Sequence, residues 1–434
     1  MMPTSRRTST SAVYGGVSSF ADNAAERPHG RAQRHGGSAI VGSVSTSYDA
    51  IVIGLGGIGS AAAYRLAQRG ARVLGLEQFE LGHDRGASQD ESRIIRLSYH
   101  RREYVELAKD AFAAWHEVEA ASGDRILTIT GGLDLAPPDA PEAIEDYAAA
   151  MTAAGVAFEW LDTAAIARRW PQWRLDDGTR GLLQEAAGIA DPSVGNPAHQ
   201  RLAREHGAEL LERVKVTGIR EEAAGELTVE TADGRRFETG AVVLATDAWT
   251  NDLLGPLGHA LPLRVTREQV TWFDATDRAA FEPDRFPIWI WLGEPSFYGF
   301  PAHRGRGPKV GQDIGGRETT ADGRSFEPDP DGLARVAGFL EQHLPTALGP
   351  TRTKTCLYTL TPDRDFVLDC VPGMPGLVVA LGAAHGYKFA ALFGRILADL
   401  ALGDRRAKTP GEGLFSCDRP ILRAASTANL VADR

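Results

Sequence analysis

Residues 51–59 read IVIGLGGIG, an apolar run that ends in a glycine-rich loop and is followed by the alanine-rich segment 60–69. Gly54, Gly56 and Gly59 have the spacing of a dinucleotide-binding fingerprint. Gly54 permits a tight turn after a strand, Gly56 lets the backbone approach a pyrophosphate, and Gly59 lets a helix pack closely on the strand. The pattern therefore predicts a strand, a phosphate-binding loop and a helix whose N-terminus faces an anion.

An acidic residue follows at the position where such a site needs one. The apolar run 72–76 ends at Glu77, eighteen residues after Gly59. A carboxylate at the end of the second strand can accept hydrogen bonds from both ribose hydroxyls of an adenine dinucleotide. The same charge repels a 2′-phosphate and argues against NADP. From this pattern alone, FAD and NAD both remain open.

Composition and charge narrow the possible partners. The chain has 434 residues, of which 43% are hydrophobic and 24% charged, enough for two domains with buried cores. The formal net charge of -10 argues against nucleic acid and an anionic membrane as general partners, because either needs a basic face. No apolar stretch approaches the roughly 18 residues of a membrane-spanning helix. The three cysteines are too scattered for a disulfide framework or a zinc site, so we expect no metal and a cytoplasmic location.

The order of elements predicts how the chain is divided. Residues 1–47 are rich in Ser, Arg, Gly and Ala, and we expect a disordered tail there. From Tyr48 the order strand, loop, helix, strand begins a doubly wound α/β domain, and a later helix is expected over 197–206. From about 262 to 352, aromatic and apolar residues alternate with polar ones, which is typical of antiparallel sheet.

Four motifs resemble, in the same order, those of the monomeric sarcosine oxidase and N-methyltryptophan oxidase family of FAD-dependent amine oxidases. They are VIGLGGIGSAAAYRLAQRG at 52–70, ESRIIRLSY at 91–99, YGFPAHRGRGPKVG at 298–311, and the pair TCLYTLTPDRDFVLD and GAAHGYKFA at 355–369 and 382–390. The resemblance covers nearly all of the chain from Tyr48 to about Pro420 and leaves out the N-terminal tail.

The resemblance implies an α/β fold with an antiparallel sheet, in which a Rossmann-like FAD-binding domain is interrupted by a sheet-rich substrate-binding domain. We assign segments 48–128, 190–262 and 355–434 to the FAD-binding domain. Segments 129–189 and 263–354 are assigned to the substrate-binding domain.

The resemblance also implies covalently bound FAD. Cys356 matches the cysteine that is joined through a thioether to the 8-methyl group of the flavin. Without the surrounding motif, the usual interpretation of a lone cysteine is a small buried hydrophobic residue. The resemblance further places Ser92 and the turn at Gly386 against the cofactor, where backbone N–H groups of the turn can bind a flavin carbonyl oxygen.

Three cationic residues are candidates for contact with the flavin and the substrate. Arg93 and Arg96 are three residues apart, so they would share a face on a helix or tight turn. The resemblance places Arg93 over the flavin ring, and Arg96 and Lys388 on the substrate carboxylate, where a guanidinium can bind two oxygens at once. The alternatives are a solvated basic patch for the two arginines and a surface ion pair for Arg96 and Lys388.

Lys309 matches the lysine that speeds reoxidation of the flavin by O2, a role that suits a positive charge because superoxide forms first. The alternative for Lys309 is an exposed lysine at a sheet edge.

Tyr298 and Tyr358 match residues that line the substrate pocket, and either is equally compatible with the core. Asp313 stands where sarcosine oxidase has a histidine. An ionised carboxylate there would hold the substrate amine protonated, or would bind a cationic or hydroxyl-bearing side chain. Asp247, where relatives usually have glycine, is expected to be structural.

The reaction implied by the resemblance is oxidation of the C–N bond of a secondary amino acid to an imine, which water hydrolyses. The reduced FAD then passes its electrons to O2, giving H2O2. The implied partners are a small-molecule amino acid and O2, and the implied state is a monomer. The alternatives are an FAD-dependent dehydrogenase that uses a protein or quinone acceptor, and a non-catalytic flavin-binding protein.

Overall fold

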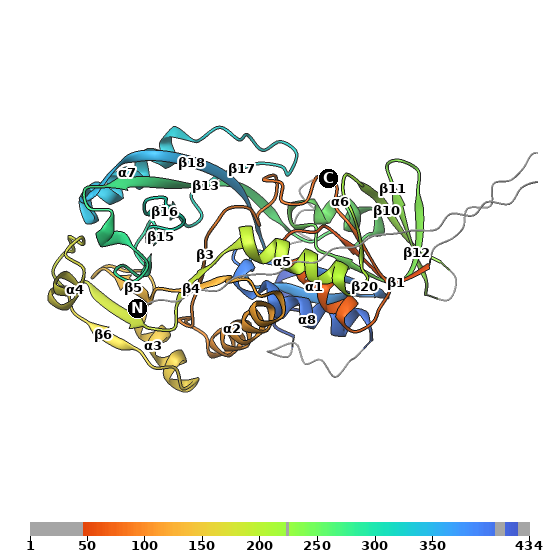
Figure 1. The fold of residues 1–434 in the computed structure, drawn as a ribbon, viewed down its shortest axis with the longest axis horizontal. Coiled ribbons are helices and arrows are strands. Elements are labelled where there is room, and N and C mark those ends of the chain that lie inside the picture. The colour runs from red at the N-terminus through yellow and green to blue at the C-terminus, as the bar shows by residue number, and fades with distance from the viewer. Residues whose placement is uncertain (1–46, 223–224, 404–412, 424–434) are drawn as a thin grey trace, which may run out of the picture. The chain divides into compact units, whose positions relative to one another are not determined.

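The structure is a computed structural model that describes residues 47–222, 225–403 and 413–423. The predicted N-terminal tail lies, up to residue 46, outside the described residues. Figure 1 shows one group of elements around β1 and α1 and another around β13 and β18. The expected fold class, an α/β unit joined to a mainly antiparallel sheet, is confirmed.

The first sheet is built on parallel strands. Its centre is β1 (Ser47–Ile53), flanked in parallel by β2 (Val73–Leu76) and β12 (Arg236–Leu244). The strand order is β10-β11-β12-β1-β2-β9, with β20 paired to β12 and β19 paired to β20. The other members are β9 (Glu209–Leu211), β10 (Val216–Glu221), β11 (Leu227–Thr231), β19 (Val367–Val371) and β20 (Met374–Leu381). All of β2 is buried, as expected for a parallel strand covered on both faces.

Helices α1 (Gly57–Gln68), α5 (Pro192–Glu205) and α8 (Ala390–Ala401) lie together beside this sheet (Figure 1). Helix α5 begins earlier than the predicted range 197–206. Its N-cap is Asp191, whose carboxylate accepts a hydrogen bond from the Ser193 N–H at 2.9 Å. Pro192 occupies the first turn, where its missing N–H costs nothing, whereas Pro197 lies inside the helix.

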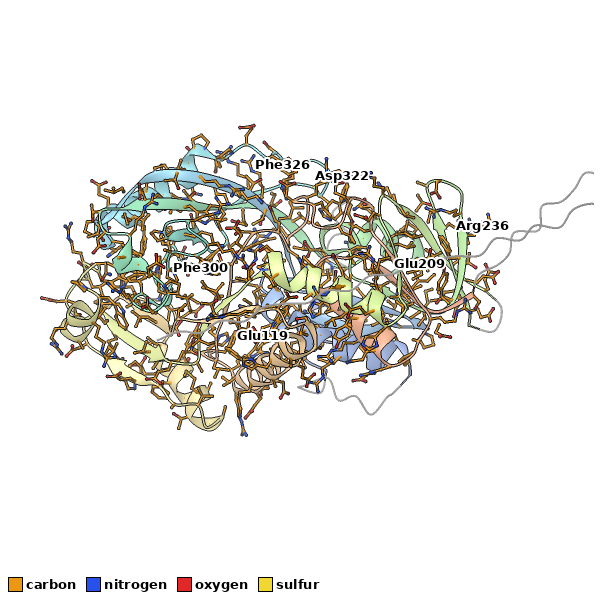
Figure 2. The ribbon with its side chains drawn as sticks, in the orientation of Figure 1. Glu119, Glu209, Arg236, Phe300, Asp322 and Phe326 are labelled. Carbon is orange, nitrogen blue, oxygen red and sulfur yellow. The ribbon has the colours of Figure 1, made fainter. Side chains whose placement is uncertain are left out.

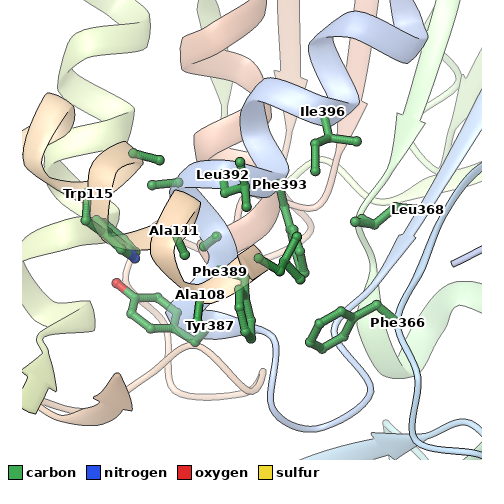
Figure 3. Packing of buried hydrophobic residues seen from close by; sticks show 14 of the residues in the cluster. Ala108, Ala111, Trp115, Phe366, Leu368, Tyr387, Phe389, Leu392, Phe393 and Ile396 are labelled. Atoms are coloured by element: carbon green, nitrogen blue, oxygen red, sulfur yellow. The ribbon is translucent and has the colours of Figure 1, made fainter. Parts of the chain in front are cut away.

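An aromatic cluster fixes the chain segment that precedes α8 (Figure 3). Phe366, Phe389 and Phe393 are fully buried, with ring centroids 4.9–5.6 Å apart. Helix α2 (Arg102–Ser122) contributes Trp115, whose indole N–H donates to the Lys388 carbonyl at 2.8 Å. The backbone that carries Lys388 is therefore held on both sides by packed aromatic residues.

The second sheet has the order β17-β13-β16-β15-β14-β5-β7-β6, and β18 pairs with β13. Its pairings are antiparallel except for β14 with β5. The strands are β5 (Gly132–Ala136), β6 (Glu159–Leu161), β7 (Arg180–Gln184), β13 (Arg264–Ala275), β14 (Ile288–Trp291), β15 (Phe297–Phe300), β16 (Lys309–Gln312), β17 (Arg317–Glu318) and β18 (Ala347–Leu360). The boundary expected between residues 354 and 355 falls inside β18, and the domain assignment stays a prediction.

A short third sheet joins β3 (Arg93–Ile95), β8 (Gly188–Ala190) and β4 (Leu127–Ile129) in antiparallel order. The remaining α-helices described are α3 (Ile144–Ala153), α4 (Thr163–Arg169), α6 (Thr250–Leu254) and α7 (Pro330–His343). In α7, Phe339 stacks on Trp289 and Phe297, with ring centroids 5.6 and 4.4 Å away. These contacts join α7 to the second sheet.

Polar side-chain contacts tie the elements to one another, and three of their acceptors are labelled in Figure 2. Glu119 of α2 accepts from the Ile126 and Leu127 N–H groups at 2.7 and 2.8 Å. Glu209 accepts from the Tyr48 hydroxyl, and Asp322 from the Trp249 indole, each at 2.8 Å. Among the described helices, none combines the length and the apolar character that crossing a membrane requires.

Candidate active site

A cavity of about 720 Å³ extends from the glycine-rich loop of the first sheet to β15, β16 and β18 of the second. Its lining includes every residue that the sequence analysis placed in the site except Gly59. The chain thus brings into one cavity residues that are up to 334 positions apart, from Gly54 to Lys388.

The glycine-rich loop has the backbone geometry that its sequence predicts. Gly54 has φ +87°, in the left-handed region. A Cβ on Gly59 would lie 1.8 Å from the Gly54 carbonyl oxygen, so the helix packs on the strand only with glycine there. At Gly56 the nearest atom, the Ser88 hydroxyl oxygen, is 3.4 Å from such a Cβ. Helix α1 begins without a side-chain cap or an acidic first turn, so its positive end is open to an anion.

Glu77 follows β2 and carries an ionised carboxylate. Burial opposes ionisation, but hydrogen bonds from His83 and from the N–H groups of Leu55 and Phe79 outweigh it and lower the pKa of Glu77. The Leu55 and Phe79 nitrogens lie 2.8 and 3.1 Å from the carboxylate oxygens. This acceptor lies beside the glycine loop, where the ribose of an adenine dinucleotide binds.

Several buried polar atoms in the cavity wall have no hydrogen-bond partner in the protein. They include the Asn196 amide oxygen, the Tyr387 hydroxyl and one carboxylate oxygen of Asp247. Asp247 has φ +47°, in the left-handed region that glycine adopts more readily than other residues. Burial raises the pKa of Asp247 to about 6. Because buried polar atoms are normally paired, these atoms and the glycine loop fit a large polar ligand such as FAD. Asp247 therefore belongs to the cavity wall, and the structural role expected of it stays a prediction.

Arg93 and Arg96 do not share a helical face, contrary to the expectation from their spacing. Arg93 begins the strand β3 and Arg96 follows it, and in a strand residues three apart point to opposite sides. Arg93 is held by the carbonyl oxygens of Ala87, Gln89 and Ser92 at 2.6–2.8 Å. Both arginines nonetheless line the cavity, at different points of its wall.

Arg96 forms an ion pair with a buried carboxylate that the sequence analysis did not single out. Its Nη1 donates to the Asp134 carboxylate at 2.8 Å, and its guanidinium lies 4.9 Å from the centre of the Tyr99 ring. Burial raises the pKa of Asp134, and Arg96 opposes this effect. The partner lies on β5 and is 3% exposed, so the alternative of a surface ion pair is wrong for Arg96.

Lys388 is half-buried near the same Tyr99 ring, with Nζ 5.8 Å from the ring's centre. Burial, reinforced by the positive charge of Arg96, lowers the pKa of Lys388 to about 7. In the described part of the chain no carboxylate lies within ion-pair distance of its ammonium group. The lysine is therefore a cationic group open to an anionic ligand.

Asp313 and the two tyrosines form a polar wall on the second sheet. Arg364 donates to both oxygens of Asp313, at 2.9 and 3.2 Å, so the carboxylate expected to act alone is paired. The hydroxyl groups of Tyr298 and Tyr358 are 3.3 Å apart. Burial raises the pKa of both tyrosines, so their hydroxyls stay neutral and can donate or accept a hydrogen bond.

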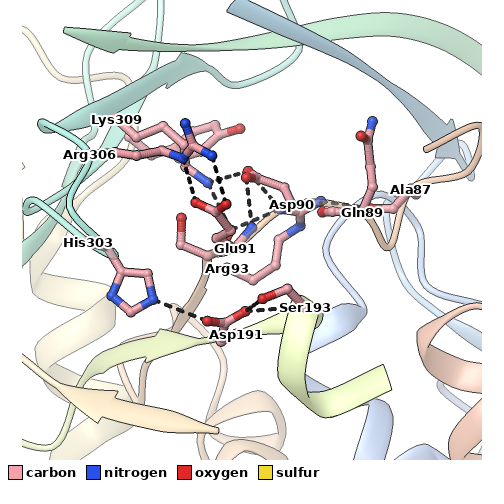
Figure 4. Close-up of polar contacts among 12 residues, drawn as sticks. Ala87, Gln89, Asp90, Glu91, Arg93, Asp191, Ser193, His303, Arg306 and Lys309 are labelled. Carbon is pink, nitrogen blue, oxygen red and sulfur yellow. Dashed lines mark hydrogen bonds and ion pairs between the residues drawn. The ribbon is translucent and has the colours of Figure 1, made fainter. Parts of the chain in front are cut away.

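Lys309 lies on β16 between β13 and β15 and is 2% exposed, so the alternative of an exposed sheet-edge lysine is wrong. Its ammonium group donates to the Asp90 carboxylate at 2.7 Å and to the Ser92 carbonyl at 2.9 Å (Figure 4). Burial lowers the pKa of Lys309 to about 8, although the charge of Asp90 acts in the opposite direction.

Cys356 lies on β18, opposite Glu268 of β13, with its thiol in the cavity wall. Burial raises the pKa of the thiol to about 11, and the positive charge of Arg93 opposes this rise. A buried cysteine in a cavity is compatible with a covalent link to a ligand there, and the protonated thiol is the dominant form at neutral pH.

Three acidic or basic partners were missed from the sequence: Asp90, Asp134 and Arg364. Asp90 stands next to the ESRIIRLSY motif, and this acidic neighbour of two arginines was a usable signal. Arg364 lies in the motif at 355–369, but nothing in that motif identifies Asp313 as its partner, and Asp134 lies in none of the quoted motifs. Each meets its partner only after distant strands and loops are brought together.

A glycine loop, an ionised carboxylate and a large cavity with unpaired polar atoms are the features of a dinucleotide-binding protein, and Arg96 and Lys388 place two cationic groups in the wall of that cavity. Comparisons with known proteins agree. The family model of the FAD dependent oxidoreductases matches residues 49–400. The chain belongs to this family of FAD-dependent oxidoreductases.

Its relatives include the proteins that the motifs resemble. Monomeric sarcosine oxidase from Arthrobacter sp. (strain TE1826) is 30% identical over 89% of this chain and all of the relative. N-methyl-L-tryptophan oxidase from Salmonella arizonae is 32% identical over 84% of this chain and 96% of the relative. The solved structure of NikD, an unusual amino acid oxidase essential for nikkomycin biosynthesis, is 31% identical, with a TM-score of 0.76 over 85% of this chain and 97% of NikD. The predicted resemblance is confirmed.

Proposed function

We propose that this protein is an FAD-dependent oxidase of a secondary amino acid. Bound FAD supplies the two-electron oxidation of the C–N bond and the transfer of those electrons to O2, and water hydrolyses the imine product. The observation that carries this proposal is the position of Arg96 and Lys388, two cationic groups in the wall of the same cavity as the glycine loop and Cys356. A cationic wall beside a flavin site suits a substrate with a carboxylate.

Arg96 and Lys388 have different tasks in binding that carboxylate. Asp134 already offsets the charge of Arg96 and holds one side of its guanidinium, which leaves the remaining N–H groups for the ligand. Lys388 supplies the uncompensated charge. Two fixed cationic groups restrict the orientation of a small amino acid, and orientation at the reacting carbon is a large part of catalysis.

Asp313, Tyr298 and Tyr358 would face the amine and its substituent. Because Arg364 pairs with Asp313, the carboxylate no longer presents a full negative charge to an ammonium group. The substrate therefore binds as the neutral amine, which is the form that can be oxidised. The tyrosine hydroxyls supply hydrogen bonds to a polar substituent.

We also propose that FAD is joined to Cys356 and is contacted by Arg93, Ser92 and the turn at Gly386. A thioether to the 8-methyl carbon would replace one of its C–H bonds: the sulfur would bond to that carbon, the proton would be released, and the two electrons would pass to the flavin and from it to O2. The step requires the thiolate, which is scarce because the pKa of the thiol is raised. Arg93 favours the thiolate by its positive charge. We further propose that the protein acts as a monomer, in line with relatives named monomeric sarcosine oxidase.

A dehydrogenase that passes electrons to another acceptor is the second candidate function. One observation favours it: the ammonium group of Lys309, the residue proposed to act on O2, is bound to the carboxylate of Asp90. An offset positive charge stabilises superoxide less well than a free one. Formation of H2O2 in air separates the two functions.

The test is an absorbance spectrum of the purified protein before and after acid precipitation, followed by a peroxide-coupled screen of N-methyl amino acids, pipecolate and fructosyl amino acids. We expect flavin absorbance in the precipitate and H2O2 with a carboxylate-bearing secondary amine. Release of flavin to the supernatant would show that Cys356 is not joined to the cofactor. A colourless protein that binds NAD would overturn the whole proposal.

A further inference from the structure

We propose that Asp90 is a positioning residue that fixes the ammonium group of Lys309 at the cavity wall, offsets part of its charge, and so sets the rate at which O2 oxidises the reduced cofactor. This role for Asp90 rests on the proposed function, in which Lys309 acts on O2. Figure 4 shows the two side chains joined by a hydrogen bond, with Arg93 and Glu91 close by.

Geometry ties Lys309 to Asp90 firmly. An ammonium group has three N–H donors, and two of them are used by the Asp90 carboxylate at 2.7 Å and the Ser92 carbonyl at 2.9 Å. Lys309 also lies over the Phe300 ring, 4.1 Å from its centre. Only one N–H is left for a water or an oxygen species in the cavity.

The backbone of Asp90 is held in a conformation that favours glycine. Its φ is +88°, in the left-handed region, and its side chain is 5% exposed. Such a conformation persists only where surrounding contacts hold it. The contacts are the ion pair with Lys309, a weaker one with Arg93 at 3.5 Å, and the Glu91 N–H at 2.7 Å. The strained position is compatible with a function for the carboxylate at this point.

The charge of Asp90 bears on the reaction with O2. In that reaction O2 gains two electrons and one proton from the anionic reduced cofactor and a second proton from water, and oxidised FAD and H2O2 form. The first electron produces superoxide, which nearby positive charge stabilises. Lys309 and Arg93 contribute positive charge and Asp90 a negative one, so the carboxylate weakens the field that favours this electron transfer.

Asp90 also keeps Lys309 protonated. Burial lowers the pKa of Lys309 to about 8, the charge of Asp90 raises it and the charge of Arg93 lowers it. Removal of the carboxylate therefore lowers this pKa further, and the gain in rate is confined to acidic conditions where Lys309 keeps its proton. The other charged or titratable groups around Lys309 and the adjacent Trp272 ring are Arg93, Cys356, Arg306 with its partner Glu91, and Arg352.

The experiment uses the flavin-loaded protein, reduced anaerobically with one equivalent of dithionite and mixed with O2 in a stopped-flow instrument over a range of pH. At the acid end of the range, where Lys309 keeps its proton in both proteins, Asp90→Asn should react on the order of tenfold faster than wild type, and this gain should be lost at a pH below the wild-type Lys309 pKa of about 8. Asp90→Gly, which also relieves the backbone strain, should behave in the same way. Lys309→Met should react more slowly. In the Lys309→Met background the charge of Asp90 still acts on the cavity, but the effect of Asp90→Asn should no longer change between about pH 6 and 8, because the group that titrates there is Lys309.

A second measurement requires neither O2 nor turnover. Sulfite adds to oxidised flavins and binds more tightly where the local charge is positive, so at about pH 6, below the Lys309 pKa of about 8, Asp90→Asn should lower its dissociation constant on the order of tenfold. Glu91→Gln is the matched control, since it breaks the neighbouring pair with Arg306 and leaves Lys309 untouched. Unchanged O2 and sulfite reactions in Asp90→Asn and Asp90→Gly, or a pH dependence of the Asp90→Asn effect that persists without Lys309, would overturn this role. Failure to oxidise amines would refute the proposed function and leave these measurements valid.

Discussion

Arg364 binds both carboxylate oxygens of Asp313, at 2.9 Å from Nη1 to Oδ2 and 3.2 Å from Nη2 to Oδ1. The pair forms part of the cavity wall, beside the hydroxyl groups of Tyr298 and Tyr358. The negative charge that Asp313 presents to the cavity is therefore offset by Arg364. In the proposed function, where Asp313 faces the substrate amine, the protonation state of that amine depends on Arg364 as much as on Asp313.

Arg364→Gln should shift the pH dependence of anaerobic flavin reduction to higher pH by about one unit or more, because the unpaired Asp313 carboxylate then stabilises the ammonium form of the substrate. The rate at neutral pH should fall accordingly. Arg395→Gln, which removes an exposed arginine paired with Glu117, is the control. An unshifted profile in Arg364→Gln would show that Asp313 does not face the amine.

Lys388→Met should raise the substrate KM by about 10- to 100-fold, the loss expected for a hydrogen bond to a charged group. In wild type, kcat/KM should fall as pH rises through about 7, because Lys388 loses its proton there, and this fall should be absent in the variant. The Lys388→Met substitution should not lower the free energy of unfolding. The pKa of Lys388 is lower in the folded than in the unfolded chain, so its penalty to stability is largest below pH 7 and disappears as pH rises toward 10.5.

The matched comparison for Lys388 is Arg96→Met. This change leaves Asp134 buried without its partner and should cost about 3–5 kcal/mol of folding free energy. A thermal melt of the two variants distinguishes them: Lys388→Met should unfold at or above the wild-type temperature, and Arg96→Met clearly below it. Equal destabilisation of both would argue that Lys388 has a structural partner.

Gly56→Ala and Gly59→Ala separate cofactor binding from packing. At Gly59 a Cβ would lie 1.8 Å from a backbone oxygen, so the variant should fail to pack α1 and should lose folded yield. At Gly56 the added methyl group meets the Ser88 hydroxyl oxygen at 3.4 Å, so the protein should fold but bind FAD at least tenfold more weakly. Circular dichroism and FAD titration give the two readouts. Normal FAD binding by Gly56→Ala would contradict close approach of the cofactor to this loop.

Cys356→Ser should release FAD on acid precipitation while the native protein still binds it. In apoprotein supplied with FAD, the rate of covalent attachment to Cys356 should rise with pH up to about 11, because the raised pKa makes thiolate scarce at neutral pH. Arg93→Gln should slow attachment, since Arg93 favours the thiolate. Attachment that is independent of pH, or retention of flavin by Cys356→Ser, would refute the proposed link.

The parts of the molecule that depend on local sequence were predictable. Gly54, Gly59 and Glu77 are required by the local geometry of the strand, turn and helix that contain or adjoin them. Their spacing in the sequence therefore predicted this part of the structure. The start of α5 was missed because Pro192 and Pro197 are both credible first-turn residues, and only the Asp191 cap distinguishes them.

The pairings inside the site were not predictable from spacing. Asp134, Arg364 and Asp90 meet their partners across 38, 51 and 219 positions of sequence. Each pairing forms only when loops and strands that are distant in the sequence are brought together, and the local sequence carries no signal of the partner. The prediction that Arg93 and Arg96 share a face was wrong for another reason. Residues three apart lie on the same face of a helix but point to opposite faces of a strand.

The central claim is tested most directly by anaerobic addition of a secondary amino acid to the flavin-loaded protein, with the corresponding amide, which lacks the carboxylate, as a matched compound. We expect loss of the oxidised flavin absorbance with the amino acid and its return on admission of air, with at least tenfold weaker binding of the amide. Equal reaction with both compounds would contradict the role of Arg96 and Lys388. No reduction by any secondary amino acid would contradict the proposed function itself.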